Sequence, residues 1–142
     1  MSIVRIALDD IKGPAPAPEG MHDLRIFSAK PSESDNANSP DWNLGIQIED
    51  DVDAAPMYHG VWFHVDPETG QDRNLEPEQK KRCQDGIKSL AEVFGLQWGD
   101  QSFDMMDFVG LTGSCRLGVK DFERKDGSPG SKNVLYLPPP KK

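Results

Sequence analysis

The feature that most constrains the fold is a single change in the spacing of apolar residues. In residues 24–65 and again in residues 110–137, apolar side chains alternate with small or polar ones, as they do in strands. Between these stretches, Pro77–Phe94 carries apolar residues at helical spacing. A proline suits its first turn, and Gly95 suits the position just past its end. The chain therefore predicts short strands interrupted by one helix, which disfavours a helical bundle.

Five segments carry the strand pattern, and Trp42–Glu49 alternates most clearly. The five are Leu24–Lys30, Trp42–Glu49, Gly60–Val65, Gly110–Glu123 and Asn133–Leu137. Three strands, a helix and two strands is the element order of the OB-fold, a small barrel that often binds single-stranded nucleic acid across one face. We therefore expect a mainly β fold, an OB-fold-like five-stranded Greek-key barrel with one α-helix between strands 3 and 4.

The length of 142 residues suits one domain. Alternating prolines at positions 14, 16 and 18 can feed neither a ladder nor a helix, so they predict an extended linker. We expect an N-terminal segment and Pro/Ala linker at 1–19, a barrel at 20–137 and a Pro/Lys tail at 138–142. No apolar run approaches the roughly 20 residues of a membrane span, and no signal peptide is evident. Together with the isolated Cys83 and Cys115, read as reduced thiols, this predicts a cytoplasmic protein without membrane contact.

Charge is distributed unevenly along the chain. The formal net charge is −8, which excludes general affinity for polyanions by charge alone. Residues 1–111 hold 9 Lys/Arg and 21 Asp/Glu, a balance of −12, whereas residues 112–142 hold 7 and 3, a balance of +4. An acidic body with a basic C-terminal hairpin can still present one local positive face.

Strand parity separates the expected core from the expected outer surface. The more apolar parity is assigned to the core: Leu24, Ile26, Trp42, Leu44, Ile46, Ile48, Val61, Phe63, Val65, Cys115, Leu117, Val119, Leu135 and Leu137. The opposite parity collects aromatic and basic side chains on the outside: Arg25, Phe27, Trp62, His64, Arg116, Lys120, Phe122 and Tyr136. For Phe27 and Trp62 a core position stays open, because closed barrels pack both faces of some strands.

Interleaved aromatic and basic side chains favour one class of ligand. An unstacked base offers a π surface to an aromatic ring, with little dependence on sequence. Nearby Lys and Arg neutralise phosphates and release counterions. The outer set therefore predicts a surface for single-stranded nucleic acid, with aromatics that stack on bases and cations that contact the backbone.

Other chemistries fit the residues less well. The three histidines and two cysteines have no zinc spacing, and 49–53 lacks the order of a calcium loop, so we expect no metal and no cofactor. A metal-dependent nuclease built on Asp104, Asp107, Glu123 and Lys125 is an alternative, because carboxylates can hold Mg²⁺ while a lysine steadies the attacking water. A third alternative is an acidic protein–protein interaction module. We expect a non-enzymatic protein.

A sparse pattern over residues 18–137 resembles phage-encoded single-stranded DNA-binding proteins with an OB-fold. The matching parts are Pro18-x-Gly20, a Ser/Asn-rich loop, Trp42-x-Leu44, Gln47-x-Glu49, Gly60, Leu90 to Gly95, Asp107-Phe108-Val109-Gly110-Leu111 and Asn133-Val134. The resemblance implies an early protein that protects single-stranded DNA in bacteriophage DNA replication and recombination, in the cytoplasm of the host cell. It implies replication or recombination proteins as partners, and a homo-oligomer stays open.

Overall fold

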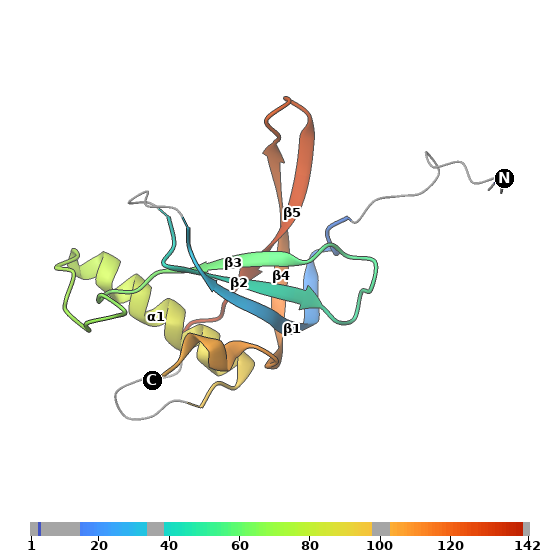
Figure 1. Cartoon of the computed structure of the whole chain (residues 1–142). Helices are drawn as coiled ribbons and strands as arrows, with labels where there is room; N and C mark the ends of the chain where they lie inside the picture. Colours follow the sequence, from blue (N-terminus) through green and yellow to red (C-terminus); the bar gives the residue numbers. More distant parts are fainter. Residues whose placement is uncertain (1–2, 4–14, 34–38, 98–102, 141–142) are drawn as a thin grey trace.

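The computed structural model describes residues 3, 15–33, 39–97 and 103–140, which form five strands, one α-helix and one 3₁₀ helix (Figure 1). In chain order these are β1 (Gly20–Pro31), β2 (Trp42–Ile48), β3 (Met57–Val61), α1 (Pro77–Phe94), η2 (Met105–Phe108), β4 (Thr112–Glu123) and β5 (Pro129–Tyr136). This arrangement confirms the expected mainly β, OB-like architecture with its helix between strands 3 and 4.

All five strands belong to one antiparallel sheet of order β3-β2-β1-β4-β5. The central strand β1 divides its pairing: residues 20–25 pair with β4, and residues 24–31 pair with β2. The two outermost strands, β3 and β5, approach each other, so the sheet curls toward a barrel. A strand that serves two neighbours along different parts of its length has to bend between them.

The bend in β1 coincides with a β-bulge at Phe27. Ile26 pairs with Ile46, but Ser28 already pairs with the next residue of β2, Gly45, so Phe27 is the extra residue. The bulge moves the inward parity by one position: Ile26 is buried before it and Ala29 after it. Phe27 is thereby left on the outer surface.

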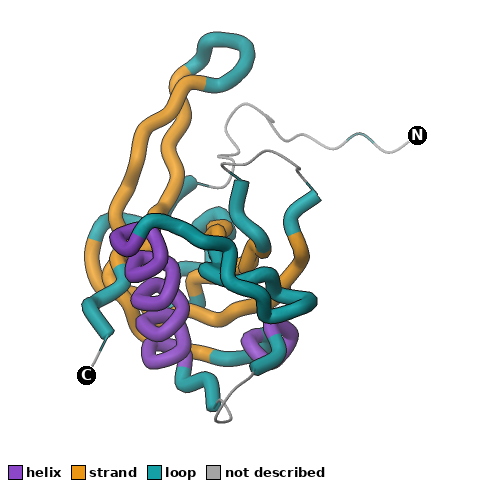
Figure 2. Tube along the Cα trace, turned by 90° about the vertical axis from the view of Figure 1, so that its left-hand side faces the viewer, coloured by secondary structure: helices purple, strands orange, loops and turns teal. Residues whose placement is uncertain are grey.

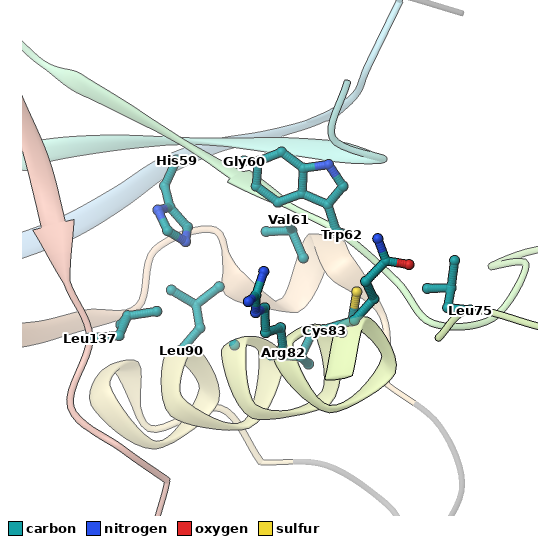
Figure 3. A pocket seen from close by; sticks show the side chains of 12 residues that line it. His59, Gly60, Val61, Trp62, Leu75, Arg82, Cys83, Leu90 and Leu137 are labelled. Carbon is teal, nitrogen blue, oxygen red and sulfur yellow. The ribbon is translucent and has the colours of Figure 1, made fainter. Parts of the chain in front are cut away.

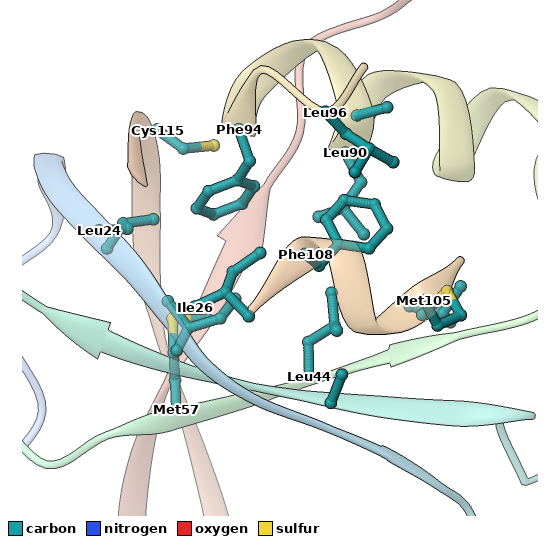
Figure 4. Close-up of a cluster of buried hydrophobic side chains, with 14 of the residues drawn as sticks. Leu24, Ile26, Leu44, Met57, Leu90, Phe94, Leu96, Met105, Phe108 and Cys115 are labelled. Carbon is teal, nitrogen blue, oxygen red and sulfur yellow. The ribbon is translucent and has the colours of Figure 1, made fainter. Parts of the chain in front are cut away.

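The core fills the interior of the curled sheet, and the helices close it (Figure 4). Leu90 and Phe94 of α1 and the fully buried Phe108 of η2 pack against Leu24 and Ile26 of β1. The helix has the bounds expected from the sequence, with a proline in its first turn and Gly95 in a left-handed conformation at its end. Sequence reasoning therefore located the helix and the face that it buries.

The alternating pattern located all five strands, but β1 and β5 begin four residues earlier than expected, at Gly20 and Pro129, and the expectations for the third strand and for Val119 are wrong. The third strand runs from Met57 to Val61 instead of Gly60 to Val65. It begins earlier because Met57 and Tyr58 already pair with β2, and it ends at Val61 because the Phe63 N–H donates to the Asp41 carboxylate at 2.8 Å and not to a strand. Val119 was assigned to the core but is 41% exposed. Beyond Gly118, β4 and β5 leave the barrel as a two-stranded hairpin that no helix or further strand of the described chain covers.

We call residues 119–132 of this hairpin the arm (Figures 1 and 2). Its tip is a turn in which the Arg124 N–H donates to the Ser128 carbonyl at 2.8 Å, and Gly127 takes a positive φ of 85°. In both views the arm and the described ends of the β1–β2 connection project from the same side of the barrel. The arm therefore extends one strand pair well past the core.

The described part of the N-terminal segment lies against the barrel. Ala17 is fully buried, and the buried side chain of Asn133 on β5 binds it on both sides. The Ala17 N–H donates to the Asn133 Oδ1 at 2.8 Å, while the Asn133 Nδ2 donates to the carbonyls of Ala17 at 2.9 Å and Gly118 at 3.1 Å. Asn133 thus joins the N-terminal segment, β4 and β5.

His22 provides a second attachment for this segment. One ring nitrogen, Nε2, lies 2.6 Å from the Pro18 carbonyl, and the other, Nδ1, lies 3.0 Å from the Asp50 carboxylate. Because both neighbours are acceptors, only the doubly protonated imidazolium can donate both bonds. The contact with the Pro18 carbonyl, and secondarily that with Asp50, raises the pKa of His22.

We expect Asn133→Ala to lower the free energy of unfolding by about 2–3 kcal/mol, because it leaves buried backbone groups of Ala17 and Gly118 without partners. Urea denaturation followed by circular dichroism measures the change. Ser131→Ala is the matched control on the same strand, since it removes only an exposed bond to Asp121. Equal, small losses in both variants would show that the hydrogen bonds of Asn133 to Ala17 and Gly118 contribute little.

We also expect the stabilising effect of His22 to depend on pH. A folded-state pKa above the unfolded value adds stability that is fully present below the unfolded pKa and is lost as the pH rises through the folded pKa. The difference in unfolding free energy between the wild type and His22→Ala should therefore be larger at about pH 5.5 than at about pH 8.5. A difference that is the same at both values contradicts a titrating contact.

Candidate nucleic-acid interface

Three exposed aromatic side chains lie on the outer face of β1 to β3 and just beyond it, and we call them the aromatic strip. They are Phe27 on β1, Tyr58 on β3 and Trp62 just after β3, exposed by 40%, 66% and 47%. The rings of Phe27 and Tyr58 meet edge to face, with centroids 6.2 Å apart. The question whether Phe27 and Trp62 belong to the core is thereby answered: both are exposed.

Glycines beneath the strip let its rings lie against the sheet. A Cβ at Gly45, on the strand between Phe27 and Tyr58, would stand 2.7 Å from the Phe27 ring. A Cβ at Gly60 would stand 3.0 Å from the Trp62 ring. Both positions face outward between strip residues, so any larger residue there would lift the neighbouring ring off the sheet.

The backbone on both sides of Trp62 is held by Asp41. The Asp41 N–H donates to the Val61 carbonyl at 2.9 Å, and the Asp41 carboxylate accepts from the Phe63 N–H at 2.8 Å. That carboxylate also pairs with Arg73 at 2.9 Å. Trp62 is therefore fixed at its backbone while its ring stays exposed, which is a preorganised arrangement for stacking.

A second surface lies on the arm, where one parity gathers basic side chains around an aromatic ring. We call Lys120, Phe122, Arg124 and Lys132 the basic arm face. The guanidinium of Arg124 and the ammonium of Lys132 lie 5.7 Å and 5.9 Å from the centre of the Phe122 ring. The opposite parity carries Asp121 and Glu123. The arm thus has one basic and one acidic face.

Within the basic arm face, Lys120 and Lys132 are directly opposed across the β4–β5 ladder. Like charges at opposed positions destabilise a strand pair. The two ammonium groups stand on an exposed hairpin beside Phe122, and no ion pair to either is found among the described residues. An anion between them would relieve the repulsion, so the arrangement suits a phosphate.

The other sequence-predicted residues are more dispersed. Tyr136 is half-exposed and covers Gly118 at the base of the arm, next to its register partner Arg116. Arg116 pairs with Glu19 at 3.4 Å, and Arg25 pairs with Glu49. Ion pairs this exposed contribute little, so a phosphate can replace either carboxylate at small cost.

His64 does not lie on the outer face of the sheet. It is partly buried in the loop after β3, where its carbonyl accepts from the Arg73 N–H at 3.3 Å. Its Nδ1 is buried without a hydrogen-bond partner among the described residues. Strand parity predicts an outward His64 only for a strand that continues to Val65, whereas the ladder ends at Val61.

Sequence reasoning missed three members of these surfaces, Tyr58, Arg124 and Lys132. Tyr58 was lost because the third strand was expected to begin at Gly60. The alternation Tyr58-Gly60-Trp62 was the signal that could have found it. Arg124 and Lys132 share the parity of Phe122 across the hairpin, but only the register of β4 with β5 shows that they surround one ring.

The four residues of the nuclease alternative do not come together. Asp104 caps the N-terminus of η2, where its carboxylate accepts from the Met106 N–H at 2.9 Å, and Asp107 lies within η2. Glu123 and Lys125 lie at the tip of the arm, on the far side of the barrel (Figure 1). Across the described ranges, no three His, Cys, Asp or Glu side chains are grouped so as to hold a metal ion.

The acidic turn at residues 49–53 is partly occupied by contacts within the chain. Glu49 pairs with Arg25, and Asp50 pairs with His22. Asp51 accepts from the Asp53 N–H at 3.3 Å and closes the turn. These contacts account for the turn as a structural feature, so it supplies no specific observation for an interaction module.

No helix in the described part of the chain has the length and apolarity needed to cross a lipid bilayer. Comparison with known proteins finds no family model that matches the chain and no curated protein that matches it significantly. The resemblance to phage single-stranded DNA-binding proteins therefore remains a prediction from the residues.

Proposed function

We propose that the chain binds single-stranded DNA with little sequence preference. In this proposal bases stack on the aromatic strip, and the basic arm face contacts phosphates. The observation that carries the proposal is the strip itself: three aromatic rings held in the open on the outer face of β1 to β3, two of them packed over glycines. Exposed rings of this kind are the stacking platforms of single-strand binders.

The location of both surfaces supports the same function. OB-folds bind oligonucleotides on the face of strands 2 and 3 and with the connections between strands 1 and 2 and between strands 4 and 5. Tyr58 of the aromatic strip lies on strand 3, with Phe27 on β1 and Trp62 just after β3, and the arm contains the connection between β4 and β5. The resemblance seen in the sequence gives the protection of single strands in phage replication and recombination as the setting.

The charge distribution favours a single strand over a duplex. The body carries a strong negative charge, and the positive balance is confined to the segment that contains the arm. A flexible strand can reach a narrow basic hairpin while keeping its phosphates away from the acidic body. A rigid duplex has a continuous phosphate surface and exposes no unstacked bases, so it gains less on this face.

The direct test is fluorescence anisotropy of a labelled oligothymidine of about 30 nucleotides, with a matched duplex as control. We expect binding of the single strand to exceed binding of the duplex. Tyr58→Ala should weaken single-strand binding by about 1–3 kcal/mol, because it removes one stacking ring. Tyr58→Phe keeps the ring and should bind as the wild type does. Absence of binding to either DNA at low salt contradicts the proposed function.

Salt dependence tests the arm separately. Lys120→Ala and Lys132→Ala should each reduce the slope of log affinity against log salt by about 0.7, the value for one phosphate contact on a single strand. Lys88→Ala removes the same charge from an exposed position on α1 and should leave the slope nearly unchanged. Equal reductions in all three variants would indicate a general charge effect without a specific contact at the arm.

A further inference from the structure

A groove of about 540 Å³ lies between β3 and α1, beside the aromatic strip (Figure 3). The strand side supplies His59, Val61 and Trp62, and the helix side supplies Arg82 and Cys83. In Figure 3 the side chains of His59 and Arg82 extend into the space between the two elements, and Leu137 lies at one end. Its volume falls in the range of small-molecule sites.

Trp62 belongs both to the aromatic strip and to the wall of this groove. Tyr58, Gly60 and Trp62 share the outward parity, so the strip leads along β3 to the mouth of the groove. Asp41 fixes the backbone at this junction through its bonds to Val61 and Phe63. His59 and Val61 have the opposite parity and face α1, so a single strand of DNA stacked on the strip has to pass the edge of β3 at Trp62 for one of its bases to enter the groove.

The groove combines an apolar floor with polar groups suited to a base and its phosphate. Leu90 and Val61 are buried beneath it. Burial lowers the pKa of His59, so its imidazole is neutral near pH 7 and offers one donor and one acceptor. Gln79 also offers both, and Arg82 adds a cation that is exposed on the helix side. Donors and acceptors beside an aromatic wall are complementary to the edge of a nucleobase.

A glycine in the middle of α1 keeps the groove open. Gly86 lines the groove, and a Cβ built on it would meet nothing within 4 Å. Glycine inside a helix destabilises it by roughly 0.5–1 kcal/mol relative to alanine. No close contact of the described structure requires a glycine here, so its effect on the fold is unfavourable, and what it provides is space in the groove.

We propose that the β3–α1 groove receives one nucleobase of the bound single strand, stacked against Trp62, with the adjoining phosphate near Arg82. This inference rests on the proposed function and adds a defined base pocket to it. The base edge faces His59 and Gln79, and the open side of Gly86 accommodates the ring.

Filling the groove tests the proposal. Gly86→Leu should weaken binding of the oligothymidine about tenfold, within the range for losing one base–aromatic stack. Gln84→Leu introduces the same side chain at an exposed position of α1 outside the groove lining and should bind as the wild type does. Thermal unfolding confirms that both variants are folded, and we expect Gly86→Leu to melt no lower than the wild type because glycine is the poorer helix former.

A second measurement separates the groove from the strip. Thymidine monophosphate, added in excess to the isotope-labelled wild type, should shift the amide resonance of Gly86. If Tyr58→Ala weakens strand binding but Gly86→Leu does not, the base pocket is wrong and the proposed function stands. If the wild type binds no oligothymidine, the proposed function fails. The titration with thymidine monophosphate then tests the base pocket independently, and an unshifted Gly86 amide resonance overturns the proposed pocket.

Discussion

The divided pairing of β1 is the constraint on which the rest of the structure depends. Because one strand pairs with β4 along its first half and with β2 along its second, the sheet must turn between the halves. The bulge at Phe27 supplies that turn and exchanges the inward parity from Ile26 to Ala29. The same step that closes the barrel around its core also sets Phe27 on the outer surface beside Tyr58, so core formation and the aromatic strip have a common origin.

One arrangement recurs on the outer surface: an aromatic ring lies over a glycine of a strand. Phe27 covers Gly45, Trp62 lies against Gly60, Tyr136 covers Gly118 and Phe122 covers Gly130. Such rings shield backbone that a glycine leaves bare, so each has a structural reason to be present. Tyr58 covers none of these glycines and is the most exposed residue of the strip, and its ring contacts the edge of Phe27. Substitution of Tyr58 therefore removes a ring available for base stacking without exposing the backbone of a glycine, which substitution of the other aromatics would do.

The spacing of apolar residues was enough to predict the order of strands and helix, because the buried face of a helix repeats about every 3.6 residues and that of a strand every two residues. Pro77–Phe94 and the inward positions Leu24 and Ile26 were predictable for that reason. The site was less predictable, since its geometry depends on pairings between distant segments. The ladder ends at Val61, where Asp41 from the β1–β2 connection accepts from the Phe63 N–H, and this removed His64 from the outer face. Tyr58 joins the outer face because the strand begins at Met57, where Met57 pairs with Ile46. Likewise, Lys132 reaches Phe122 only through the hairpin register.

The proposed preference for unstacked DNA requires that an acidic chain place its positive charge away from its body. Long-range repulsion from a body of net negative charge opposes every polyanion, and screening limits it to about 8–10 Å at moderate salt. The arm carries its cations beyond the core, on a hairpin whose acidic residues Asp121 and Glu123 face the other way. A single strand of DNA bound at the arm escapes most of the repulsion, but it gains the stacking energy only if its bases are unpaired. In the proposed function, repulsion by the body and stacking on the strip together discriminate against a duplex, which experiences the repulsion and lacks the stacking.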